Sequence, residues 1–174
     1  MLPFDLQTGL ILEDTGLVLR WCDQRDTLTE SADYWQRSGD ALILAWRSRL
    51  MLGGLRGNVT TKLPDATNAL PTGFMLGLSC RERPAQTIAM AYNELQSELI
   101  TRFGRPHERH DGDDSAEAMW RLDGITIRHE YWDGFGGDHY VLVYPASKTP
   151  NNNAVRTEHG LQGFTNGMSS LRAR

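Results

Sequence analysis

The alternation of apolar and polar residues between positions 117 and 144 predicts three antiparallel strands. Asp123-Gly124 fits a two-residue turn of the type I′ kind, in which both residues take positive φ. A turn of this length fixes the register of the two strands that it joins. The expected pairs, all on one apolar face, are Leu122 with Ile125, Trp120 with Ile127, and Ala118 with His129.

The other face of these strands is polar. It carries Arg121, Thr126, Arg128 and Glu130, so we expect this side of the sheet to face water. A glycine-rich turn at 133–138 then leads into a strand over 140–144.

The N-terminal half predicts strands over 6–12, 17–22, 41–47 and 50–63. Residues 27–30 fit a capping box, and the apolar spacing of Leu28, Ala32 and Trp35 predicts a short helix over about 27–36. Gly53-Gly54 interrupts the last strand and indicates a bulge or a close backbone approach.

The C-terminal half begins with a predicted strand over 74–80 and a long helix over 85–103. The apolar stripe of this helix consists of Ile88, Tyr92, Leu95, Leu99 and Phe103. Gly104 fits a left-handed helix terminator, and Pro106 prevents the helix from continuing. We expect residues 107–116 to form a polar loop.

These elements define an α+β fold, with an antiparallel sheet and two helices on one of its faces. The order of elements suggests a tandem duplication of a β-α-β-β unit, with half-repeats over 6–63 and 73–145. A single domain over 1–145 would be followed by a flexible tail over 146–174, where the periodicity ends.

Composition and charge narrow the function classes. Residues 1–145 hold 14 Lys+Arg against 21 Asp+Glu, which gives −7, and residues 146–174 hold 4 against 1, which gives +3. An acidic body argues against nucleic-acid binding and suits a basic protein partner. No run approaches the ~18 apolar residues of a membrane helix. The start lacks a secretory signal, and Cys22 and Cys80 lie in apolar runs typical of buried thiols, so we expect a cytoplasmic protein.

Two groups of histidines are candidates for chemistry. His107 and His110 lie among Glu108, Asp111, Asp113 and Asp114, but in a predicted loop that would not hold them together as metal ligands. His129 is expected on the apolar face and Glu130 on the polar one, and Asp138 and His139 also diverge along a strand. We therefore expect a structural histidine at 129, no metal, no cofactor and no catalytic residue.

Two aromatic residues are not placed in the expected core. Trp132 shares the alternation of Arg128 and Glu130, and Phe135 lies at the tip of the glycine-rich turn. Exposed aromatic side chains beside arginine are enriched at protein-binding surfaces. Arg128, Glu130, Trp132 and Phe135 are accordingly the predicted partner-binding residues.

Short motifs add a resemblance to known proteins. Trp21-Cys22-Asp23 before the first predicted helix, the stretch 53–59, and Phe103-Gly104-Arg105-Pro106 before a tryptophan strand resemble small bacterial proteins of the toxin-immunity type. The two-unit layout over residues 6–145 is similar to that of the beta-lactamase inhibitor protein family. The resemblance implies a protein that binds another protein, and it assigns no role to any residue.

The sequence thus favours a non-catalytic protein-binding module, such as an immunity or inhibitor protein that occludes its partner. One alternative is a small metal-dependent hydrolase that uses His107 and His110 with nearby carboxylates, or His129 with His139. Another alternative is a structural subunit or adaptor of a larger assembly.

Overall fold

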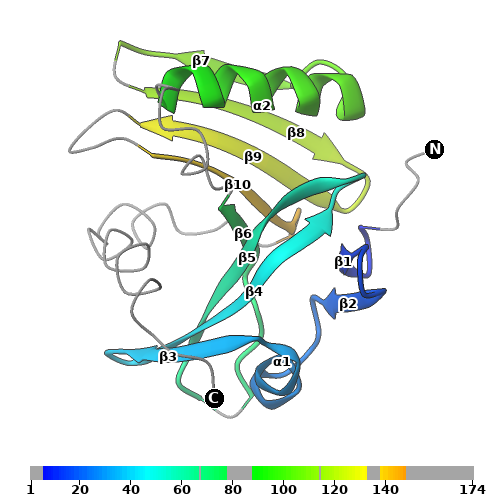
Figure 1. Ribbon diagram of the computed structural model, residues 1–174, viewed down its shortest axis with the longest axis vertical. Helices are drawn as coiled ribbons and strands as arrows, with labels where there is room; N and C mark the ends of the chain where they lie inside the picture. Colours follow the sequence, from blue (N-terminus) through cyan, green and yellow to red (C-terminus); the bar gives the residue numbers. More distant parts are fainter. Residues whose placement is uncertain (1–5, 67, 78–87, 114, 133–137, 148–174) are drawn as a thin grey trace.

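An eight-stranded antiparallel sheet forms the body of the protein, as seen in the computed structural model (Figure 1). The structure describes residues 6–66, 68–77, 88–113, 115–132 and 138–147. The strand order is β3-β4-β5-β6-β10-β9-β8-β7, and β1 and β2 form a separate two-stranded sheet. The elements are β1 (Gly9–Leu12), β2 (Leu17–Arg20), α1 (Arg25–Ser31), β3 (Tyr34–Ser38), β4 (Ala41–Met51), β5 (Leu55–Pro64), β6 (Phe74–Gly77), α2 (Ile88–Phe103), β7 (Glu108–Asp111), β8 (Ser115–Leu122), β9 (Ile125–Trp132) and β10 (Asp138–Pro145).

The predicted register of β8 and β9 is confirmed. Leu122 pairs with Ile125, Trp120 with Ile127, and Ala118 with His129. The turn type is wrong, because Gly124 has φ 78° while Asp123 is not among the described residues with positive φ. One left-handed position, supplied by glycine, is sufficient for this turn.

A fully buried row of side chains crosses the sheet on one face. Directly paired residues point to the same side of a sheet, so the register defines the row without ambiguity. Its members, one each from β4, β5, β6, β10, β9 and β8, are Trp46, Val59, Leu76, Val141, His129 and Ala118. Five of the six are apolar, so His129 is a polar group in the middle of the hydrophobic core.

Helix α2 covers the part of this face formed by β9 and β10 (Figure 1). Its buried residues include Tyr92, Leu95 and Leu99, which belong to the predicted stripe. Gly104 ends the helix with φ 77°, and its N–H donates to the carbonyl of Ile100, as expected of a left-handed terminator. That both helices cover one face, and that the two halves are a duplication, stay predictions.

The short helix predicted over 27–36 is present, but its bounds and its capping box are wrong. Helix α1 begins at Arg25 after the N-cap Gln24, which makes no side-chain cap, and it ends at Ser31. Trp35 lies instead on β3, where it is 55% exposed. The apolar spacing of Leu28, Ala32 and Trp35 fits a helix of two turns, but Asp33 instead binds β4 and the chain becomes extended from Tyr34.

The strand predicted over 50–63 is really the end of β4, a turn, and β5. Gly53 and Gly54 lie in the turn, and their N–H groups donate to the carboxylate of Glu13 at 2.5 and 2.8 Å. The bulge lies earlier, between Trp46 and Arg49, where Ser48 has φ 52°. A left-handed serine is costly, so local hydrogen bonds must hold it in place.

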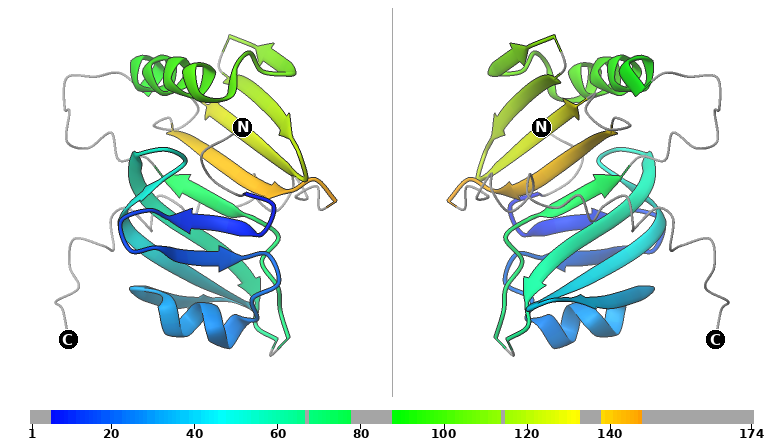
Figure 2. Two further views of the ribbon diagram at one scale, coloured as in Figure 1. Left: turned by 90° about the vertical axis from the view of Figure 1, so that its right-hand side faces the viewer. Right: turned by 90° about the vertical axis from the view of Figure 1, so that its left-hand side faces the viewer.

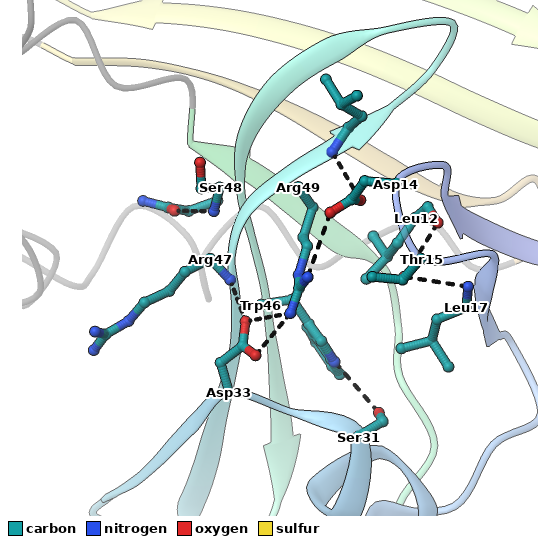
Figure 3. Close-up of polar contacts among 12 residues, drawn as sticks. Leu12, Asp14, Thr15, Leu17, Ser31, Asp33, Trp46, Arg47, Ser48 and Arg49 are labelled. Atoms are coloured by element: carbon teal, nitrogen blue, oxygen red, sulfur yellow. Dashed lines mark hydrogen bonds and ion pairs between the residues drawn. The ribbon is translucent and has the colours of Figure 1, made fainter. Parts of the chain in front are cut away.

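The Arg49 clasp (Asp14, Asp33 and Arg49) lies beside this bulge (Figure 3). Arg49 donates to both carboxylate oxygens of Asp33, at 2.7 and 2.9 Å, and to Asp14 at 3.4 Å. Asp33 also accepts the N–H of Arg47, and Asp14 accepts the N–H of Leu50. The clasp therefore ties the β1–β2 turn and the start of β3 to both ends of the bulge, and Figure 2 shows β1 and β2 lying against β4 and β5.

Candidate functional site

The sequence predicted that the polar face of β9 is open to water, but this face is largely buried. Arg128 is only 4% exposed, and Thr126 is buried as well. Arg128 forms an ion pair with Glu130, and the hydroxyl of Tyr140 donates to the same carboxylate. A charged strand residue can be buried when a neighbour on the same face supplies a counter-charge and hydrogen bonds. Arg128 is therefore an internal support for Glu130 and not a surface contact.

Trp132, the next residue on this face, is exposed to 46% at the end of β9. It is paired across the sheet with Ser115 on β8. We call Ser115, Glu130 and Trp132 the Trp132 surface. Phe135, the fourth predicted partner-binding residue, lies outside the described residues. The structure thus brings Glu130 and Trp132 together on one face, with Arg128 buried behind the carboxylate.

A second group of polar side chains, the histidine cluster, lies between α2 and the sheet. It consists of Tyr92, Gln96, His129 and His139, all of which are buried. Nδ1 of His129 is 2.7 Å from Oε1 of Gln96, and Nε2 of His129 is 3.4 Å from Nδ1 of His139. The ring of Tyr92 stacks on that of His129 with 4.2 Å between centroids.

The contacts of His129 define its protonation. An amide oxygen can only accept, so Nδ1 of His129 carries the hydrogen and Nε2 is left as an acceptor for His139. Burial lowers the pKa of His129 to about 3, and the neighbouring His139 lowers it as well. The imidazole is therefore neutral at physiological pH, as suits a structural core residue.

The histidine cluster does not form an accessible reaction centre. His129 is 0% exposed, so a substrate could not contact its ring without a rearrangement of the core. In the part of the chain that the structure describes, no group of three or more His, Cys, Asp or Glu side chains could hold a metal ion. The predicted structural role of His129 agrees with its complete burial and its bond to Gln96.

The segment 107–116 is partly a strand, which corrects the predicted polar loop. Residues 108–111 form β7, paired with β8. His110 lies on β7, whereas His107 lies in the bend that precedes this strand. Nδ1 of His107 accepts the backbone N–H of Arg121 at 3.2 Å.

Other sequence expectations have mixed outcomes. Trp120 and Tyr92, which the sequence placed on the apolar face of its strand and in the apolar stripe of the long helix, are buried in the core. Cys22 is exposed, which corrects the expectation of a buried thiol, because β2 ends at Arg20 and leaves Cys22 in a turn. Cys80 lies outside the described residues. No helix within the described ranges is long and apolar enough to cross a membrane.

Sequence reasoning missed the exposed Trp35, the Arg49 clasp and the role of Gln96. A signal for Gln96 was present, because it follows Tyr92 by four residues and so lies on the buried side of α2. The clasp left no local signal, since Asp14, Asp33 and Arg49 are far apart in sequence.

The chain is thus an α+β protein with an antiparallel sheet, a buried histidine cluster and an exposed tryptophan at a strand end. Comparison with protein-family models, curated proteins and solved structures finds no match to it.

Proposed function

We propose that this chain is a non-catalytic protein-binding module of the immunity or inhibitor type, which neutralises a partner protein by covering part of its surface. The observation that carries the proposal is the exposed indole of Trp132 beside a fixed carboxylate. Tryptophan is strongly enriched among the residues that dominate binding energy at protein interfaces. The resemblance to toxin-immunity proteins points to the same class.

The geometry of Glu130 supports this role. Arg128 and Tyr140 both bind its carboxylate, so the side chain is held in one position next to Trp132. A preordered polar group loses little conformational entropy when a partner binds. The net charge of −7 over residues 1–145 would in addition attract a basic partner, with association rates that fall as salt is added.

Affinity capture with a matched control tests the proposal. Wild-type protein, Trp132→Ala and Trp35→Ala are immobilised in parallel, and proteins retained from the source cell are quantified by mass spectrometry. We expect one protein enriched by wild type and by Trp35→Ala but not by Trp132→Ala. Titration calorimetry with that purified protein should then show a loss of about 2 kcal/mol or more for Trp132→Ala.

Three results would count against the proposal. One is that wild type retains no protein above a bare resin. Another is that Trp132→Ala and Trp35→Ala weaken capture equally, which would indicate adsorption through any exposed tryptophan. The third is that Trp132→Ala melts well below wild type, which would make Trp132 a structural residue.

A further inference from the structure

Strand β3 forms one edge of the eight-stranded sheet, with β4 on its inner side. From Trp35 to Ser38 all its residues are exposed. Within the ranges that the structure describes, no strand pairs with its outer side. The backbone donors and acceptors on that side can therefore pair with a strand of another molecule.

The two edges of the sheet differ in their side chains. Strand β7, at the other edge, consists of four exposed residues, Glu108, Arg109, His110 and Asp111. Charged side chains on an edge strand oppose pairing with another chain. Strand β3 has Arg37 as its one charged residue, has no proline, and presents the indole of Trp35. The edge at β7 is protected and the edge at β3 is not.

We infer that two copies of this chain pair through β3, antiparallel, about a two-fold axis at Gln36. This register places Trp35 of each copy opposite Arg37 of the other, because the two residues flank Gln36 at equal distance. Residues directly opposite in an antiparallel pair lie about 4.5–5.5 Å apart at Cβ, which lets a guanidinium pack on an indole. The symmetry produces this contact twice. The inference is independent of the proposed function.

The remaining pairs of this register are also compatible. Tyr34 faces Ser38, and the two Gln36 side chains face each other, where each amide can both donate and accept. An axis at Arg37 would instead place two arginines opposite each other, which is destabilising. In the register about Gln36, every directly opposed pair of β3 residues is thus compatible.

The contacts within one copy favour the same arrangement. Nε of Arg37 lies 3.2 Å from Asp65, which holds the guanidinium beside the strand although the side chain is mostly exposed. On the other face, the guanidinium of Arg47 lies over the ring of Tyr34, 5.4 Å from its centroid. Trp35, which has no such partner among the described residues, is the aromatic group of β3 that remains for a second copy.

Cysteine cross-linking tests the register directly. In a background with Cys22 and Cys80 replaced by serine, Gln36→Cys places the two sulfur atoms across the axis, within the range that a disulfide spans. The matched control is Ser38→Cys, whose two copies would lie about 13 Å apart along the strands. Gln36→Cys should give a disulfide-linked dimer under mild oxidation, and Ser38→Cys should not.

Sedimentation equilibrium of the unmodified chain measures the association itself. A mass twice that of the chain is expected at roughly 100 µM protein. Trp35→Ala and Arg37→Glu should each weaken the dimer about tenfold or more. Trp35→Lys combined with Arg37→Glu should restore much of it, because the introduced ammonium of each copy would then face the introduced carboxylate of the other.

Three outcomes would overturn the inference. The chain could sediment as a monomer throughout, or the two cysteine variants could cross-link equally. A dimer that is unchanged by both Trp35→Ala and Arg37→Glu would mean that another surface forms it.

Discussion

Lowering the pH from about 7.5 to about 5 should destabilise this protein through His129. The change in pH acts through the protonation of the His129 ring. His129 is fully buried under α2, where burial and the nearby His139 hold its pKa at about 3 against 6.5 in an unfolded chain. Because the folded pKa is the lower one, the unfolded state takes up the proton first as the pH falls. The contribution of neutral His129 to the stability of the fold is therefore fully present above pH 6.5, and it is lost progressively between pH 6.5 and about 3.

The size of the effect follows from these two pKa values. The lowering of the His129 pKa from 6.5 to about 3 corresponds to roughly 5 kcal/mol, an upper limit that is reached only below about pH 3. At about pH 5 the unfolded histidine is almost fully protonated and the folded one is not, which costs about 2 kcal/mol. For a fold with roughly 5–15 kcal/mol of total stability, this is a large fraction.

Urea unfolding followed by tryptophan fluorescence measures this loss. His129→Asn keeps an N–H that can donate to Gln96 but cannot titrate, so it should be less stable at neutral pH and should lose about 2 kcal/mol less than wild type on going to about pH 5. If wild type and His129→Asn lose stability in parallel as the pH falls, the assignment to His129 is wrong.

Three further predictions concern other parts of the fold. Arg49→Met should cost about 1 kcal/mol or more in urea unfolding, because it leaves the carboxylate of Asp33 without the guanidinium that donates to both of its oxygens, and Arg49→Lys should recover part of the loss. Trp132→Ala should change the unfolding free energy by no more than about 0.5 kcal/mol, whereas Trp120→Ala should cost about 3–5 kcal/mol, as calorimetry can show. Zinc titration of the stretch 107–114 should give no saturable heat, because Nδ1 of His107 already accepts the N–H of Arg121 and His110 lies on the strand that follows; a one-to-one isotherm would contradict this arrangement.

The parts of the fold that the sequence predicted are those with local rules. The register of β8 and β9 follows from a two-residue loop and the alternation on each side of it, both within a few residues of the turn. The end of α2 follows in the same way from Gly104, since only one residue has to adopt the left-handed conformation.

The wrong predictions concern residues whose conformation or burial depends on contacts with residues far away in the sequence. Leu28, Ala32 and Trp35 match a helical stripe, but Asp33 binds Arg49 and the N–H of Arg47, and this holds the chain in an extended form that continues into β3. Arg128 looks like a solvent-facing residue by alternation. Its burial depends on Glu130, which also accepts a hydrogen bond from Tyr140 on the next strand. Neither fact can be inferred from spacing along one strand.

The site prediction was affected by the same limitation. Polarity along β9 identified Glu130 and Trp132 as neighbours on one face, which is correct, but it treated Arg128 as a contact residue. Trp35 was assigned to a helix core and so was not considered as a surface group. An aromatic residue on an edge strand can be recognised only after the strand order is known.

Both faces of the central strands β9 and β10 are buried, so the surfaces available for binding lie at strand ends and at sheet edges. On β10, Val141 and Leu142 point to opposite faces and both are buried, and the same holds for Ile127 and Arg128 on β9. A partner therefore cannot lie across the middle of either face, whereas Trp35 at the β3 edge and Trp132 at the end of β9 are exposed. Four strands separate β3 from β9 in the sheet order. Pairing through β3 would accordingly leave the Trp132 surface of each copy uncovered. The dimer would then present two binding sites. A partner with repeated or immobilised target sites could bind both at once, which raises the apparent affinity.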